Sequence, residues 1–410
     1  MGEWANKTVE LDVTNIAHGG VAVARLEGRV VFVSDAIPGE RVTARVSDDS
    51  KSSFWRADAV SVVEPSPHRR AHVWAAASID RDPADRAGGA EFGHIELGHQ
   101  RELKRQVLAD ALSRMARLET DVAVEALPGD EASGGTRWRT RVRLHVDDRG
   151  VPGPFAARSH NVIEVQDLPL ATAEVAEAAP LAERFPGERH VDVLAPSAGG
   201  ARLVIGEQKA STITEQVGQR QFRLTDRGFW QVHRAAAEAL TAAVQNAVDP
   251  GLFDPRAANL DLYGGVGLFA AAIGDRFGPA VRMTSVESDP VATEFAGENL
   301  VDWVGATAET GRVERWLHQL AQRASSLERA RLAEATVVLD PPRAGAGKNV
   351  VRQLADLAPR QIVYVACDPV AFARDIHLFA VRGYRLAALR AFDLFPNTHH
   401  LEAVGTLTRD

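Results

Sequence analysis

The only thiol in this chain of 410 residues belongs to Cys367. It stands in segment 363–369, Val-Tyr-Val-Ala-Cys-Asp-Pro, where an apolar, strand-like run ends in a turn. A thiol at the carboxyl end of a strand can act as a nucleophile, because ligands of α/β proteins bind at that edge of the sheet. A lone cysteine is also a common small core residue, so the residues around it must decide.

Carboxylates close two other segments. Asp340 ends the apolar run 335–340 and is followed by Pro341 and Pro342, which forbid a regular helix or sheet ladder and fix the loop. Glu402 ends the segment 392–402, Phe-Asp-Leu-Phe-Pro-Asn-Thr-His-His-Leu-Glu. A carboxylate at a strand terminus, like the thiol, belongs to the expected ligand site.

A glycine-rich loop follows the apolar run 259–263. The loop, 264–270, reads Gly-Gly-Val-Gly-Leu-Phe-Ala and allows a tight turn and close approach of a ligand to the backbone. Glu287 follows about 20 residues on, where a carboxylate can accept hydrogen bonds from ribose hydroxyls. A nicotinamide dehydrogenase and an S-adenosylmethionine methyltransferase would both show this pair, and a purely structural glycine turn is a third reading.

The elements that must position these residues begin near residue 225. Helices alternate there with apolar runs, which predicts a parallel, doubly wound α/β sheet. The expected strands are 259–263, 283–287, 335–340 and 361–365. We therefore expect a catalytic domain over residues 216–410, with the ligand site at the carboxyl ends of its strands.

Two further domains are expected before it. Short β-branched runs separated by turn residues predict a small antiparallel barrel over residues 1–66. The runs are 9–13, 29–33, 41–46 and 59–63. Pro65 and Pro67 mark its boundary. Residues 67–215 are predicted to form a mixed α/β central domain that includes an amphipathic helix over 99–118.

Composition limits the function classes. The length suggests two or three domains at about 150 residues each, and 45% hydrophobic residues suffice for real cores. A single cysteine excludes an internal disulfide and any site built from several thiolates. No targeting segment opens the chain, and no run of about 18 apolar residues occurs. We expect a soluble, cytoplasmic protein that neither contacts a membrane nor depends on a protein partner.

The net charge of −8 argues against binding of polyanions through bulk charge, so a nucleic-acid site must be a local patch. One candidate is segment 137–143, which holds four arginines and Trp138 in seven residues. Its alternation predicts a strand with arginines on one face. A solvated charged strand face explains the same pattern.

Five ordered motifs across the last 180 or so residues resemble one known family. They are 228–232, 260–267, 339–343, 364–369 and 393–402. The chain is similar to the S-adenosylmethionine-dependent RNA uridine-5 methyltransferases, whose fold is a Rossmann-like class I methyltransferase domain. Residues 8–64 look like the TRAM barrel, an OB-like RNA-binding domain that many members carry.

The resemblance implies a reaction and a set of roles. Cys367 matches the nucleophile that adds to carbon 6 of uridine, and Glu402 matches the general base that removes the proton from carbon 5. The matches to cofactor-binding positions are Gln231, Tyr263, Glu287 and Asp340. Glu287 would hold the ribose, and Asp340 would lie between cofactor and target base.

The target base must be flipped out or unpaired to be reached. Phe395, Pro396 and the pair His399 and His400 are expected to line its pocket. Metal binding by the two histidines is not expected, because no third ligand with suitable spacing accompanies them.

The chain also departs from the family. Many members bind an iron-sulfur cluster, but segment 86–90 reads Arg-Ala-Gly-Gly-Ala with alanine at both thiol positions, and Leu168 stands where another thiol would be. We infer that no cluster is bound, and that apolar packing or polar loop contacts replace it. Leu268 and His233 stand where asparagine is common. Residues 1–64 hold seven basic and ten acidic residues, a net charge of −3, so the barrel must meet RNA through a restricted face or through shape and stacking.

Rival functions remain. A non-catalytic RNA-binding protein is disfavoured by the joint presence of Cys367, Glu402 and Asp340, and a dehydrogenase by the last two motifs. DNA cytosine-5 methyltransferases place the nucleophile directly after a proline, whereas Ala366 precedes it here. Another pyrimidine substrate stays open. Because some tRNA-modifying members lack the barrel, its presence favours ribosomal RNA over tRNA as the substrate.

Overall fold

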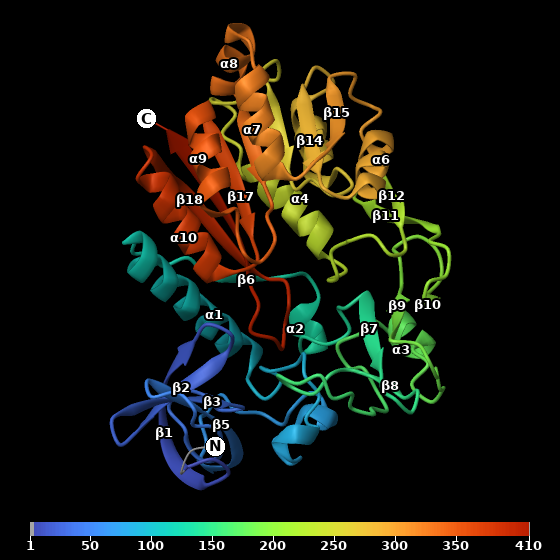
Figure 1. The fold of residues 1–410 in the computed structure, drawn as a ribbon. Helices are drawn as coiled ribbons and strands as arrows, with labels where there is room; N and C mark the ends of the chain where they lie inside the picture. Colours follow the sequence, from blue (N-terminus) through green and yellow to red (C-terminus); the bar gives the residue numbers. More distant parts are fainter. Residues whose placement is uncertain (1–3, 410) are drawn as a thin grey trace.

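The computed structural model describes residues 4–409, which fold into three parts (Figure 1). A small barrel and a mixed middle region lie side by side at one end, and a large α/β sheet with its helices fills the other. The barrel and the doubly wound sheet are both as expected from the sequence.

Five strands close the amino-terminal barrel in the order β1-β2-β3-β5-β4. They are β1 (Thr8–Ala17), β2 (Val21–Leu26), β3 (Arg29–Ser34), β4 (Arg41–Asp48) and β5 (Phe54–Glu64). Alternate residues point inward, as Val31 and Val33 do, because successive side chains of a strand face opposite sides. The expectation of a fully antiparallel barrel was wrong at one pair: β5 pairs antiparallel with β4 but closes the barrel parallel to β3. Strand β2 was not anticipated.

The middle region builds a four-stranded sheet in the order β10-β9-β7-β8 beside several short helices. Its elements are α1 (Leu97–Ala111), β6 (Val124–Ala126), α2 (Asp130–Ser133), β7 (Arg141–Val146), β8 (Pro152–Gly153), α3 (Ala173–Ala178), β9 (His190–Leu194) and β10 (Arg202–Ile205). The helix expected to reach residue 118 ends sooner. A π-helical turn at Leu112–Ala116 follows α1, and Arg117 adopts a left-handed conformation with φ 56°.

The arginine strand expected at 137–143 was placed too early. Arg137 has φ 58°, which breaks an extended run, and Trp138 is buried with 1% of its surface exposed. Only from Arg141 onward does the chain enter strand β7.

A two-stranded hairpin, β11 (Thr212–Val217) and β12 (Arg220–Thr225), leads into the large sheet. The sheet order is β15-β14-β13-β16-β17-β19-β18-β6. Its carboxy-terminal strands are β13 (Asn259–Leu262), β14 (Met283–Glu287), β15 (Ala306–Thr310), β16 (Thr336–Leu339), β17 (Gln361–Ala366), β18 (Tyr384–Asp393) and β19 (Glu402–Arg409). Strands β13 to β17 are parallel, and β19 runs antiparallel to β17.

Helices cover both faces of this sheet and give it two apolar cores. They are α4 (Ala236–Ala247), α5 (Leu268–Phe277), α6 (Pro290–Asn299), α7 (Val313–Arg323), α8 (Ser326–Ala333), α9 (Gly347–Leu357) and α10 (Pro369–Ala380). Strand β6 of the middle region pairs parallel with β18 and so extends the catalytic sheet. The boundaries 1–66, 67–215 and 216–410 stay predictions. None of the helices within residues 4–409 has the length and apolar character needed to cross a membrane.

Candidate active site

The thiol and the two carboxyls meet where three neighbouring strands end. Because β17 and β19 are antiparallel, with Ala366 opposite Ala403, the next residues, Cys367 and Glu402, come together at this end. Asp340 follows directly after β16, the parallel neighbour of β17. The sheet therefore gathers residues separated by many positions in the chain.

Burial and mutual repulsion shape the proton affinities of this group. Burial, together with the charges of Glu402 and Asp340, raises the pKa of Cys367 to about 12, while the charge of Arg343 opposes the shift. Burial, with the charge of Asp340, also raises the pKa of Glu402 well above its usual value. Burial and the charge of Asp261 raise the pKa of Asp340 to about 7. Cys367 and Glu402 thus hold their protons at neutral pH, Asp340 is close to its midpoint, and the Arg343 charge acts on both Cys367 and Glu402.

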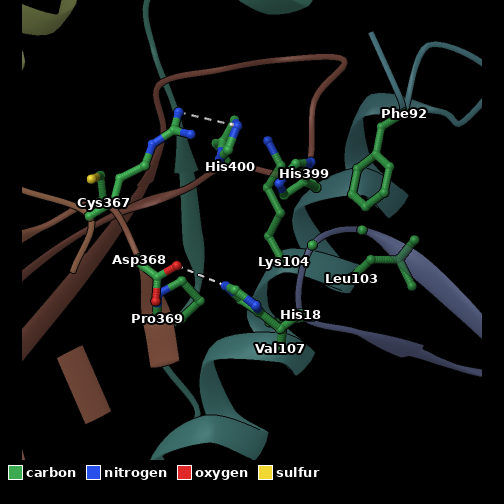
Figure 2. Close-up of a pocket in the computed structure, with 13 residues that line it drawn as sticks. His18, Phe92, Leu103, Lys104, Val107, Cys367, Asp368, Pro369, His399 and His400 are labelled. Atoms are coloured by element: carbon green, nitrogen blue, oxygen red, sulfur yellow. Dashed lines mark hydrogen bonds and ion pairs between the residues drawn. The ribbon is translucent and has the colours of Figure 1, made fainter. Parts of the chain in front are cut away.

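A cavity of about 150 Å³ opens beside Cys367. All three parts of the molecule contribute to its wall (Figure 2). The lining residues are His18, Gly19, Gly20, Phe92, Leu103, Lys104, Val107, Arg343, Cys367, Asp368, Pro369, His399 and His400. Its position next to the thiol makes it the candidate pocket for a flipped base.

The expectation for the pocket wall holds for two of the four residues named. His399 and His400 line the cavity, whereas Phe395 and Pro396 do not. Phe395 instead lies behind His400, with ring centroids 5.8 Å apart. Within residues 4–409, no group of three or more His, Cys, Asp or Glu side chains is arranged to hold a metal ion.

Helix α1 anchors the loop that carries the two histidines. The Lys104 ammonium donates to Asp393 Oδ1 at 2.5 Å and to the Phe395 carbonyl at 3.1 Å, with both charged side chains buried. The Gln100 side chain accepts from the Asn397 amide at 2.8 Å. Sequence reasoning missed Lys104, since only the docking of α1 against the catalytic sheet brings it into the cavity wall.

The glycine loop lies at the ends of β13 and β14. A Cβ on Gly264 would lie 2.0 Å from Ser285 Oγ and 2.7 Å from Asp261 Oδ2, so only glycine fits there. The Gly265 amide donates to Glu287 Oε2 at 3.2 Å. Buried Asp261 accepts from Ser285 and keeps its Oδ1 without a partner within residues 4–409.

The remaining cofactor candidates take different places. Tyr263 follows β13 with φ 62°, a strained conformation for a bulky residue of the kind that clusters at ligand sites. Its ring packs against the core of the sheet, and burial raises its pKa to about 12. Gln231 lines a separate hollow of about 300 Å³, which none of the other three cofactor candidates lines.

Comparison with known proteins shows the family to which the chain belongs. Residues 188–410 match the family model described as tRNA (Uracil-5-)-methyltransferase, and residues 5–60 match the TRAM domain. The first of these covers more than half of the chain. The chain belongs to the tRNA (uracil-5-)-methyltransferase family. The resemblance found in the sequence is thereby confirmed.

Relatives match over nearly the whole length. An uncharacterized RNA methyltransferase of Streptomyces avermitilis is 37% identical, covering 97% of each chain, and one of Bifidobacterium longum is 36% identical, covering 98% of this chain and 96% of the relative. The fold resembles the crystal structure of Pyrococcus abyssi tRNA (uracil-54, C5)-methyltransferase in complex with S-adenosyl-L-homocysteine. The TM-score is 0.69 at 21% identity, over 99% of this chain and 100% of that one.

Membership makes the protein an S-adenosylmethionine-dependent RNA (uracil-5-)-methyltransferase, so the expected fold class, enzyme class and cofactor are confirmed. The loop edge fits such a cofactor on its own chemistry. It combines a close backbone approach that only glycine permits at Gly264, a buried Asp261 oxygen without a partner within residues 4–409, and the Glu287 carboxylate beside it. The assignment of individual cofactor residues remains a prediction.

Apolar packing occupies the positions where other members carry cluster thiols. Ala87, Ala90 and Leu168 are buried in one hydrophobic core together with Trp74 and Trp138. The two tryptophans supply large apolar area where small residues replace thiols. That no cluster is bound at these positions stays a prediction.

The arginine segment is less open than its sequence suggests. Arg141 pairs with Glu215 at 3.2 Å and donates to the Gly228 carbonyl at 2.7 Å. Arg143 pairs with Asp192 through two hydrogen bonds, at 2.7 and 2.8 Å. The segment is therefore partly structural, and it does not present four free cations to RNA.

Proposed function

We propose that this enzyme methylates carbon 5 of a uridine in cytoplasmic ribosomal RNA or tRNA through a covalent adduct with Cys367. The observation that supports this most is the meeting of Cys367 with Glu402, Asp340 and Arg343 at one edge of the sheet. Of these four, Cys367 and Arg343 line the cavity. Carbon 5 of uridine is a weak nucleophile, so electron density must first be pushed into it. A nucleophile and a base on the same side of the sheet serve that need.

The first step is addition of the Cys367 thiolate to carbon 6. The thiol gives its proton to solvent, the sulfur–carbon bond forms, and the π electrons of the 5,6 double bond move toward oxygen 4 as an enolate. The Arg343 cation supports both the thiolate and the enolate, since its charge already lowers the pKa of Cys367. His400 holds the guanidinium at 3.5 Å.

The second step releases the product. S-adenosylmethionine, when bound, supplies an electrophilic methyl group. Glu402 then takes the proton from carbon 5, the double bond re-forms and the sulfur leaves. A carboxylate with a raised pKa is a stronger base than an exposed one, so burial of Glu402 suits this role once it is ionised.

A denaturing-gel assay tests the covalent route. RNA containing 5-fluorouridine, incubated with enzyme and S-adenosylmethionine, should yield a complex that survives denaturant, because fluorine cannot be removed as a proton. Cys367→Ala should yield none. Absence of the complex with wild-type enzyme and an RNA that it demonstrably methylates would refute the covalent mechanism.

Mapping identifies the target. Total RNA from a strain that lacks this protein should have lost 5-methyluridine at one or a few positions. We place ribosomal RNA slightly ahead of tRNA on account of the barrel. Loss at a tRNA position alone would reverse that preference, and loss of 5-methylcytidine would redirect the proposal to another pyrimidine.

A further inference from the structure

The turn between β1 and β2 of the barrel reaches into the catalytic pocket. His18, Gly19 and Gly20 of this turn lie in the wall of the cavity beside Cys367, on the side opposite the sheet. A TRAM domain that only gathered RNA would not need to border the nucleophile. We propose that this turn is part of the catalytic apparatus, and that His18 is a positioning residue that holds Asp368 and thereby orients Cys367. This rests on the covalent function proposed above.

The contact between His18 and Asp368 is direct. His18 Nε2 lies 2.8 Å from Asp368 Oδ2 (Figure 2). The other oxygen of that carboxylate, Oδ1, accepts the backbone amides of Val370 at 3.0 Å and Ala371 at 2.8 Å, and so caps helix α10. The two oxygens thus fix Asp368 from two sides, and the residue immediately before it is Cys367.

The turn is shaped to come this close. Gly20 has φ 73°, and a Cβ there would lie 2.4 Å from His399 Cβ and 3.1 Å from the Phe92 ring. Gly28, in the next turn of the barrel, has a similar φ of 81° but nothing within 4 Å of such a Cβ. Both positions favour glycine for the backbone, and only Gly20 needs it for a contact with the pocket.

The barrel is held against the pocket by an apolar seam. Ile16 and Ile37 of the barrel pack with Phe92, Ile95 and Leu103 of the middle region in one buried cluster. Phe92 and Leu103 also line the cavity, so the seam and the pocket share a wall. A fixed barrel can transmit the position of His18 to the active site, because a well-packed seam resists displacement.

Loss of the contact should slow the chemistry more than it weakens RNA binding. The adduct is again trapped with 5-fluorouridine RNA, now at saturating RNA, and its rate is compared with the Kd measured by filter binding. His18→Ala should reduce the adduct rate about ten- to a hundredfold, as a misplaced reacting group does, with Kd within about twofold. His18→Gln keeps a side-chain N–H donor and should recover part of the rate.

Glycine variants supply the matched control. Gly20→Ala should slow adduct formation, because the new methyl group pushes the turn away from His399. Gly28→Ala carries the same backbone strain at a remote turn and should leave the rate unchanged. Thermal unfolding of each variant shows whether the fold is retained. If His18→Ala does not fold, the adduct rate of His18→Gln is compared with that of the wild type instead.

The outcomes separate the two proposals. No adduct with wild-type enzyme overturns the covalent function. The positioning role is then judged by the methyl-transfer rate of His18→Ala at saturating RNA, which should still fall about ten- to a hundredfold, and an unchanged rate overturns it. Adduct formation by His18→Ala at the wild-type rate overturns the positioning role. A weaker Kd with an unchanged rate at saturation would mean that His18 contacts RNA instead.

Discussion

The acidic side chains that join the barrel to the middle region and the two carboxyls beside Cys367 have opposite surroundings. Where the barrel meets the middle region, Glu40 accepts hydrogen bonds from Arg69 at 2.6 and 2.7 Å. Asp35 accepts one from Arg86 at 2.7 Å, and Asp58 pairs with Arg158. Each of these acids thus has a cation from the middle region.

The two carboxyls beside the thiol differ from these acids, and also from Asp393 at the end of β18, which pairs with Lys104. Within residues 4–409, neither Asp340 nor Glu402 makes a side-chain hydrogen bond or ion pair, and burial raises the pKa of both. Burial also raises the pKa of Asp35, but Arg86 opposes that shift. Paired acids join the parts of this molecule, whereas unpaired acids store proton affinity for the reaction. The acidic character of the barrel is thereby explained in part: some of its carboxylates face protein, not RNA.

The largest effect is expected when an unpaired acid is removed. Glu402→Gln should lower turnover by about 10²- to 10⁴-fold, the usual contribution of a general base, and should leave the melting temperature unchanged or higher. The adduct should accumulate on ordinary uridine RNA, because release needs loss of the proton on carbon 5. Turnover is measured by methyl incorporation, and a gel detects the adduct. A variant that turns over normally would remove Glu402 from the mechanism.

Removal of a paired acid should lower the stability of the protein and leave its chemistry unchanged. Glu40→Gln leaves the Arg69 cation without its carboxylate in a buried site, so the free energy of unfolding should fall by about 3 kcal/mol, with the adduct rate of the folded protein kept. Urea unfolding measures this. Glu64→Gln, at an exposed barrel pair with Arg41, is the control and should cost less than about 1 kcal/mol. Equal losses for the two variants would contradict the comparison.

The raised proton affinities predict a pH dependence. Cys367 and Glu402 both have pKa values above their usual range, so both hold protons in the free enzyme at neutral pH. Rising pH increases the fraction with the thiolate, and the rate of adduct formation should climb from pH 6 to pH 9, by up to about tenfold per unit. The rate is measured at saturating RNA, with Kd followed separately. A rate that falls as pH rises would contradict these assignments.

The sequence predicted the catalytic sheet well because its strands are apolar runs that end in polar residues. Cys367, Asp340 and Glu287 could be assigned to strand ends from local pattern alone, and parallel strands bring such ends to one edge. The roles of Cys367 and Glu402 came from motifs. Their proximity depends on the antiparallel return of β19, which periodicity does not reveal.

Contacts between the three parts of the molecule could not be predicted from local sequence patterns. Lys104 meets Asp393 across 289 positions and His18 meets Asp368 across 350, so both depend on how separate parts dock. Strand β6 has three residues, too few to show alternation. Phe395 was assigned to the pocket from its motif, but the loop turns its ring behind His400. Residues assigned from local pattern could be predicted from the sequence, whereas contacts that form only when separate parts of the molecule dock were missed.

The last prediction concerns the free energy of unfolding that the unpaired Asp340 carboxyl costs the folded protein. The folded pKa of Asp340, about 7, lies above the unfolded value near 3.9, so the folded protein holds a proton that the unfolded chain releases. This contribution to stability is present at low pH and is lost as pH rises from about 4 to 7. Asp340→Asn should therefore gain stability over wild type at pH 8, by at most the roughly 4 kcal/mol that a rise of about three pKa units represents, and little at pH 4, by urea unfolding. Asp12→Asn, on the exposed barrel surface, should show no such difference. A gain for Asp340→Asn that is equal at both pH values would mean that the asparagine improves packing, and that the carboxyl carries no protonation cost.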